Sequence, residues 1–193
     1  MKKNISPKDG WISLKPGAEV QLDDRLVKDW HSQTRKLRET RGNILAYTIE
    51  IELCLDQILN LLFFPKRESN EESSDEIKKL FDVFILKEKP FSSKIQLFKN
   101  LCSEHPLLNS AKDFNFKEIL SDLDKIRDIR NRFAHNTVTF FPQGDIANQT
   151  LAAKLTCYDK DIDLDESYFK LSQVVFQKTM EFLDKLIKYL ESI

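Results

Sequence analysis

Apolar side chains recur at helical spacing along most of the chain. No proline interrupts the segment from Asp23 or Asp24, either of which suits a helix cap, to Pro65. Within it, one seam follows alternating steps of three and four residues: Ile44, Thr48, Ile51, Leu55, Ile58 and Leu62. Such a seam indicates a long helix packed along one face. Shorter amphipathic patterns predict further helices over residues 77–89, 91–102, 116–135 and 165–190.

The pattern changes between the last two predicted helices. Residues 138–141 alternate in character, a Pro-Gln-Gly-Asp turn follows, and residues 151–158 form a second run with β propensity. We therefore expect a small β-hairpin inserted at residues 137–164. The predicted fold class is all-α: an antiparallel helical bundle of about five helices, with this hairpin before the last helix.

Length and composition indicate one domain preceded by an arm. Residues 1–22 contain prolines and glycines and show no period, which predicts an irregular N-terminal arm, whereas residues 23–193 are expected to form a single helical domain. No segment reaches the ~20 apolar residues of a membrane span. The 3 cysteines match neither a disulfide framework nor a zinc site, so reduced thiols and a cytoplasmic location are expected.

The overall charge provides no general attraction for RNA. Lysine plus arginine number 30 and aspartate plus glutamate 31, so any RNA contact requires a local patch. The first third of the predicted long helix is rich in basic residues: Arg25, Lys28, Arg35, Lys36, Arg38 and Arg41. This segment is either an RNA-facing strip or a solvated helix face, and the interspersed Asp29 and Glu39 favour the solvated face.

The most informative motif is the sequence RNRFAH at residues 130–135. It places an arginine and a titratable histidine at the end of the fourth predicted helix. This sequence resembles the Arg-polar-x-x-x-His signature of HEPN domains, all-helical modules that include many metal-independent RNA-cutting toxins and immunity nucleases. A long helix precedes the motif and another helix follows it, as in that family. The resemblance implies a HEPN-like fold over residues 23–193 and a ribonuclease of the toxin or phage-defence type.

The resemblance also implies a catalytic site built on Arg130, Asn131 and His135. RNA carries its own nucleophile, the 2′-hydroxyl beside the scissile phosphate, so cleavage needs proton transfer and charge stabilisation but no metal or cofactor. His135 is expected to act as general base or acid and Arg130 to hold two phosphorane oxygens, while Asn131 orients the phosphate or positions the histidine. The expected products are a 2′,3′-cyclic phosphate and a 5′-hydroxyl, and DNA should be inert. Arg127 and Arg132 flank the motif as candidate phosphate contacts.

Helix geometry separates the two defining residues of the motif. Five positions on an ideal helix amount to roughly 500°, so Arg130 and His135 stand about 140° apart around the axis. They can meet if His135 lies on a loosened last turn, or if a second copy supplies the partner group across a two-fold interface. HEPN domains pair so that two motifs line one cleft, and the resemblance therefore implies a homodimer. An antitoxin or another regulatory protein is a further candidate partner.

Two other interpretations of the motif stay open. A HEPN-like domain can be a non-catalytic module that binds and regulates a protein or nucleic-acid partner. An arginine and a histidine near a helix C-terminus also interact favourably with the helix dipole, so the pair can be purely structural. Acidic residues of the first long helix face the cleft in some HEPN nucleases, and Glu50 and Glu52 are the candidates here.

The remaining candidate residues do not indicate a metal site. His31 and His105 are isolated in sequence from the motif histidine. Residues 159–165 contain alternating aspartates but lack the glycine and the closing glutamate of a calcium loop, so they are expected to form an acidic turn.

Overall fold

The structure, a computed structural model, describes residues 12–14, 24–65, 72–144, 150–157 and 161–193. The predicted arm at residues 1–22 lies outside the described residues except for Ile12–Leu14. Those three residues form strand β1, which the sequence pattern did not predict.

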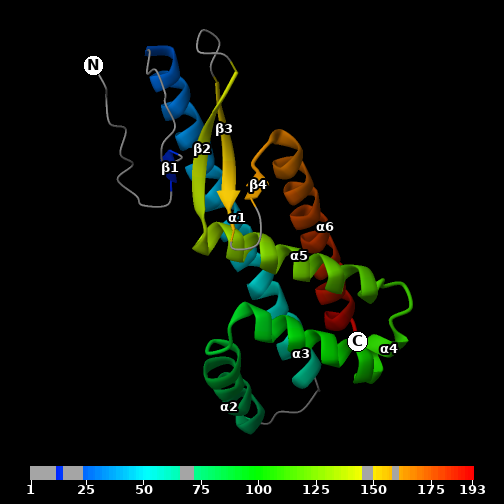
Figure 1. Cartoon of the computed structure of the whole chain (residues 1–193). Coiled ribbons are helices and arrows are strands. Elements are labelled where there is room, and N and C mark those ends of the chain that lie inside the picture. The colour runs from blue at the N-terminus through cyan, green and yellow to red at the C-terminus, as the bar shows by residue number, and fades with distance from the viewer. Residues whose placement is uncertain (1–11, 15–23, 66–71, 145–149, 158–160) are drawn as a thin grey trace. The chain divides into compact units, whose positions relative to one another are not determined.

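Helices make up most of the described chain, as the sequence predicted (Figure 1). They are α1 (Asp24–Phe63), α2 (Glu72–Phe81), the π-helical η1 (Asp82–Leu86), α3 (Phe91–Glu104), α4 (Pro106–Ser110), α5 (Phe116–His135) and α6 (Glu166–Glu191). Five predicted helices correspond to α1, α2 with η1, α3, α5 and α6. The short α4 was not predicted, and it begins at a proline, a residue well suited to the first position of a helix.

A small sheet lies between α5 and α6 in the sequence, and the predicted hairpin is confirmed. Strands β2 (Thr137–Gln143) and β3 (Thr150–Thr156) pair antiparallel, with Val138 opposite Leu155. The sheet has four strands in the order β1-β2-β3-β4, because β1 pairs parallel to β2 and β4 (Asp161–Asp163) pairs antiparallel to β3 (Figure 1). The prediction of an acidic turn at residues 159–165 is therefore wrong for Asp161–Asp163. These residues form an extended strand, which is held by backbone pairing with β3 and by a Lys154–Asp163 ion pair of 3.3 Å.

The chain divides into two compact units, which we describe separately. The hairpin unit comprises residues 1–46 and 129–172, and the helical unit comprises residues 47–128 and 173–193. Helices α1, α5 and α6 contribute residues to both units. Across the described part of the chain, none of the helices combines the length and apolar character needed to cross a membrane.

In the hairpin unit, the first part of α1 packs against the sheet. The rings of Trp30 and Phe140 lie 4.6 Å apart between centroids, and both side chains are buried. Gln33 Nε2 donates a hydrogen bond of 2.9 Å to the carbonyl oxygen of Leu151 on β3. Phe133 of α5 is buried at 1% exposure, with its ring 6.2 Å from that of Tyr168 on α6. The contact between Phe133 and Tyr168 holds the last turns of α5 against α6 within the hairpin unit.

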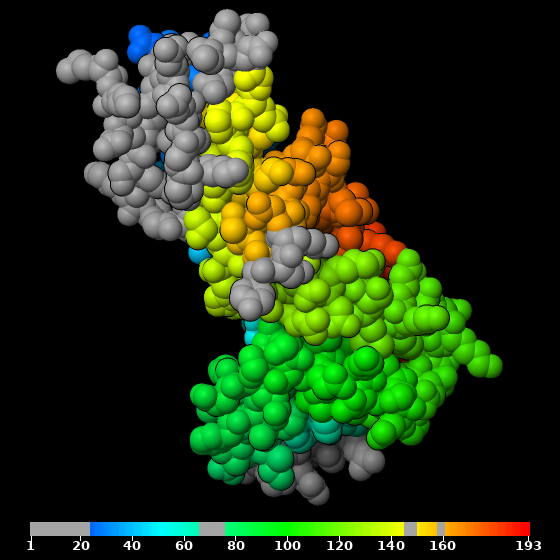
Figure 2. Space-filling view, in the orientation of Figure 1, coloured from blue at the N-terminus to red at the C-terminus, as the bar shows by residue number. Residues whose placement is uncertain are grey.

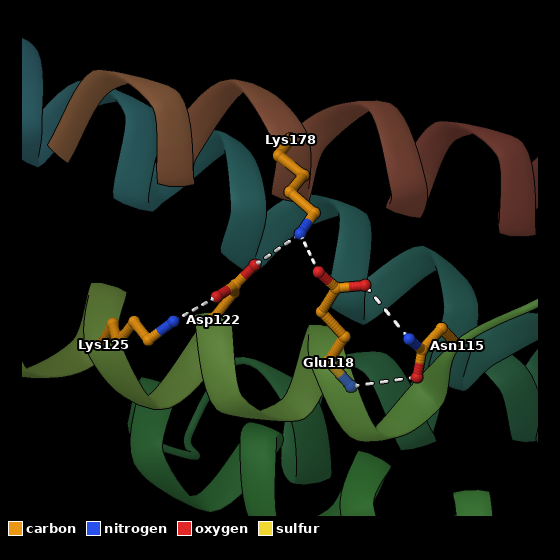
Figure 3. Close-up of polar contacts among 5 residues, drawn as sticks. All are labelled: Asn115, Glu118, Asp122, Lys125 and Lys178. Carbon is orange, nitrogen blue, oxygen red and sulfur yellow. Dashed lines mark hydrogen bonds and ion pairs between the residues drawn. The ribbon is translucent and has the colours of Figure 1, made fainter. Parts of the chain in front are cut away.

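In the helical unit, a charged network joins α5 to α6 (Figure 3). Lys178 of α6 forms ion pairs with Glu118 and Asp122 of α5, and Asp122 also binds Lys125 at 2.7 Å. Asn115, directly before α5, is joined to this network through Glu118: its Oδ1 accepts a hydrogen bond of 3.3 Å from the Glu118 backbone N–H. The Asp122 side chain is only 5% exposed, so its two lysine partners offset the cost of burying a carboxylate.

Candidate functional site

The motif occupies the last turns of α5, directly before the sheet. Helix α5 ends at His135 and strand β2 begins at Thr137. The backbone N–H of Asn136 donates a 3.0 Å hydrogen bond to the carbonyl oxygen of Arg132, four residues earlier. This is the regular α-helical bond, so the last turn is not loosened. A loosened last turn was one of the two ways in which Arg130 and His135 could meet, and the described backbone does not have it.

Asn131 links the predicted catalytic residues, because it contacts Arg130 and shares a helix face with His135. Asn131 and His135 are exposed and lie four residues apart, so they share one face of α5. Arg130 Nη1 donates a hydrogen bond of 3.0 Å to Asn131 Oδ1. The half-buried arginine thus turns its guanidinium toward the face that carries His135. The result is an accessible cation and imidazole at the end of one helix.

Arg132, a predicted phosphate contact, lies beside a different residue. Burial raises the pKa of the Tyr168 phenol, and the nearby positive charge of Arg132 opposes that rise. Arg132 is half-buried and stands about 200° around the helix from Arg130. Arg132 therefore lies beside Tyr168 of α6, on a different side of α5 from Arg130.

Arg127, the other predicted phosphate contact, is already bound to carboxylates in the helical unit. Its Nη1 lies 2.7 Å from Asp124 Oδ1, and its Nη2 lies 3.1 Å from Asp128 Oδ1. Two acids therefore neutralise this arginine. A phosphate contact at Arg127 would have to compete with both of them.

Arg41 of α1 is a cation near the motif that sequence reasoning did not assign to the site. Its Nη2 donates to the carbonyl oxygen of Ala134 at 3.5 Å, one residue before His135. A positive charge at this place is favourable because helix carbonyl groups point toward it. The basic run along the first part of α1 was the available signal, but spacing alone did not indicate which member reaches α5.

A buried lysine that binds two carboxylates in the helical unit was also not predicted from the sequence. Lys94 of α3 lies 2.8 Å from both Glu52 Oε1 and Asp56 Oδ2 of α1. Glu52, expected as a candidate near the motif, is thus engaged in this cluster, while Glu50 is exposed in the same unit. Burial raises the pKa of the Asp56 carboxyl more than the hydrogen bond from Lys94 lowers it. The cluster binds α1 to α3.

Among the described residues, the cysteines and acidic side chains provide no further candidate site. Burial raises the pKa of the Cys54 thiol, and burial raises that of Cys102 to about 12, so both thiols are protonated near neutral pH. Throughout the ranges that the structure describes, no three His, Cys, Asp or Glu side chains gather to hold a metal ion.

Comparisons with family models, with curated proteins and with solved structures gave no match to this chain. The geometry at the end of α5 is therefore the basis for assigning a function.

Proposed function

We propose that this protein is a HEPN-like, metal-independent endoribonuclease of the toxin or phage-defence type. The observation that carries the proposal is the Arg130–Asn131 hydrogen bond of 3.0 Å on the helix face where His135 is exposed. Through Asn131, this hydrogen bond holds a permanent cation toward the helix face that carries the His135 imidazole. A long helix before the motif helix and another helix after it also support the proposal, because the HEPN resemblance rests on that order.

In this mechanism, the three motif side chains provide proton transfer, charge stabilisation and positioning. When His135 accepts the proton of the RNA 2′-hydroxyl as its oxygen attacks the adjacent phosphorus, water protonates the departing 5′-oxygen. When His135 instead donates a proton to the 5′-oxygen, water accepts the proton of the 2′-hydroxyl. Arg130 stabilises the charge that develops on the phosphorane oxygens. Asn131 holds the guanidinium and offers its amide N–H group to the phosphate. The bond from phosphorus to the 5′-oxygen breaks, which leaves a 2′,3′-cyclic phosphate and a 5′-hydroxyl.

A cleavage assay on mixed cellular RNA with EDTA tests the proposal. The wild-type protein should cut RNA without added metal, and the products should carry cyclic phosphate ends. A DNA oligonucleotide of matched sequence is the control, because it lacks the 2′-hydroxyl that acts as nucleophile. Cleavage that needs a divalent metal, or equal cleavage of DNA, would contradict this mechanism.

The proposed enzyme is a homodimer in which two motifs line one cleft. The regular last turn of α5 supports this arrangement, since the backbone positions of Arg130 and His135 stay about 140° apart around the helix, although Asn131 draws the Arg130 guanidinium toward the His135 face. If they act across the dimer, a purified heterodimer of Arg130→Ala and His135→Ala chains holds one complete site. That heterodimer should cleave at about half the wild-type rate, although each variant alone is inactive. An inactive heterodimer would place both residues of each site in one chain.

A non-catalytic regulatory module is the second candidate. The observation that favours it is the acidic setting of α5, where Asp124 and Asp128 bind Arg127 in the turns before the motif. The formal net charge of the chain is also −1, which adds no general attraction for phosphates. Such a module would bind its partner saturably, and binding would survive His135→Ala.

A further inference from the structure

The carbonyl groups at the end of α5 lose the partners that they have inside a helix. The last four carbonyl oxygens of an α-helix are beyond the reach of its regular hydrogen bonds. Arg132 still has a partner, because the Asn136 N–H donates to its carbonyl oxygen at 3.0 Å. For Ala134 the residue four positions on is Val138, which belongs to strand β2 and pairs with Leu155. The Ala134 carbonyl therefore accepts its hydrogen bond from outside the helix.

Arg41 of α1 donates that hydrogen bond. Its Nη2 lies 3.5 Å from the Ala134 carbonyl oxygen, and both residues belong to the hairpin unit. Arg41 is half-buried, and its neighbours on the same side of α1, Leu37 and Ile44, are buried at 3% and 4% exposure. The stem of Arg41 therefore leaves a packed part of α1, and its guanidinium reaches the end of α5 from there.

The direction of the His135 side chain depends on the same turn. His135 follows Ala134 directly and is the last residue of α5. Its side chain is exposed, and within the described ranges its imidazole forms no hydrogen bond that would orient it. The yellow-green segment where α5 leads into β2 forms part of the outer surface in the space-filling view (Figure 2). The backbone of the last turn therefore determines where this accessible imidazole points.

We propose that Arg41 is a positioning residue, which holds the last turn of α5 and so fixes the direction of the His135 imidazole. This inference rests on the proposed ribonuclease function, because that function gives the imidazole its role in proton transfer. Proton transfer requires an imidazole nitrogen within hydrogen-bond reach of the RNA oxygen, so a small rotation of the turn slows the reaction. Arg41 acts in the same way whether Arg130 comes from the same copy or from a second one.

The geometry favours positioning over a direct contact between Arg41 and an RNA phosphate. Arg41 directs a guanidinium N–H at a carbonyl oxygen of the protein, whereas Arg130 turns its guanidinium toward the exposed Asn131. The negative end of the α5 dipole also stabilises a cation at the place that Arg41 occupies. The two roles differ in the step that they affect. Positioning determines the rate of cleavage, and a phosphate contact determines how tightly RNA binds.

Single-turnover cleavage of one RNA oligonucleotide, measured over a range of protein concentrations, separates these roles. Arg41→Met keeps the apolar stem but removes the donor, and it should lower the maximal rate about 10-fold, because a misplaced proton-transfer group slows the chemical step. The half-saturating protein concentration should stay within about twofold of wild type. Arg41→Lys should recover most of the rate, since its ammonium group can also donate to the Ala134 carbonyl.

A direct phosphate contact would give the opposite result. Arg41→Met would then raise the half-saturating concentration, leave the maximal rate unchanged and weaken the dependence of binding on salt. This outcome would overturn the proposal. Arg35→Ala is the matched control, because Arg35 also lies on α1 but pairs with the exposed Glu39 and should alter neither quantity. Thermal melting verifies that each variant is folded.

An NMR measurement without RNA tests the positioning apart from the ribonuclease proposal. In Arg41→Met, the Asn136 amide should exchange faster with solvent, because its hydrogen bond to Arg132 closes the last turn. The His135 ring signal should shift, while that of His31, elsewhere on α1, stays unchanged. Unchanged exchange at Asn136 together with an unchanged His135 signal would overturn the proposal. A wild-type protein that cuts no RNA would refute the ribonuclease function, and the NMR result would still decide whether Arg41 holds His135.

Discussion

Replacing His135 with alanine should lower the rate of RNA cleavage at least about 100-fold, the typical contribution of one general acid or base. The protein should stay folded, because the His135 side chain is exposed and contributes no core packing. The measurement is the initial rate of cleavage with EDTA present, together with the melting temperature of both proteins. A large loss of rate at an unchanged melting temperature would identify His135 as the proton-transfer group.

His31→Ala is the matched control for this experiment. His31 is also an exposed helical histidine, but it lies on α1 outside the motif. Its removal should leave the cleavage rate unchanged. If His135→Ala instead lowers the melting temperature and neither protein cuts RNA, the purely structural interpretation of the motif gains support. Saturable partner binding by both proteins without cleavage would favour the regulatory module.

The helices and the hairpin could be predicted because local patterns determine them. The periodic apolar seam of α1 and the alternating residues of β2 are properties of neighbouring positions. Asp165 directly precedes α6 and makes a local capping contact, because its Oδ1 accepts a 2.8 Å hydrogen bond from the Tyr168 backbone N–H. Strands β1 and β4 were missed because each has only three residues and depends on pairing with a distant strand.

Only the motif residues of the candidate site could be predicted from the sequence. Arg130, Asn131 and His135 lie within six consecutive residues, so their types and spacing could be recognised directly. The approach of Arg41 to Ala134 and that of Lys94 to Asp56 join residues of different helices. Such contacts depend on how helices pack, which the periodicity of each helix does not specify. The ion pairs that neutralise Arg127 are local, but several acids in its neighbourhood were equally available partners.

Lys94→Ala should reduce the free energy of unfolding by about 3–5 kcal/mol, the usual cost of removing one partner from a buried ion pair. The Lys94 side chain is only 4% exposed, and its loss leaves Glu52 and Asp56 without their shared cation. Asp56 Oδ1 is already buried with no hydrogen-bond partner among the described residues. Urea denaturation measures the effect. Arg35→Ala is the control, since its exposed pair with Glu39 should contribute less than about 1 kcal/mol.

The pH dependence of this difference provides an independent test. Burial alone would lower the pKa of Lys94, but hydrogen bonds with Asp56 and Glu52 raise it above its ordinary value. The stabilisation is therefore fully present below the pKa of an unfolded lysine and is lost as pH rises through the higher folded value. The difference between wild type and Lys94→Ala should persist at neutral pH and shrink only in strongly alkaline solution. A difference that vanishes near neutrality would mean that Lys94 is uncharged in the fold, and the two carboxylates would then need another source of compensation.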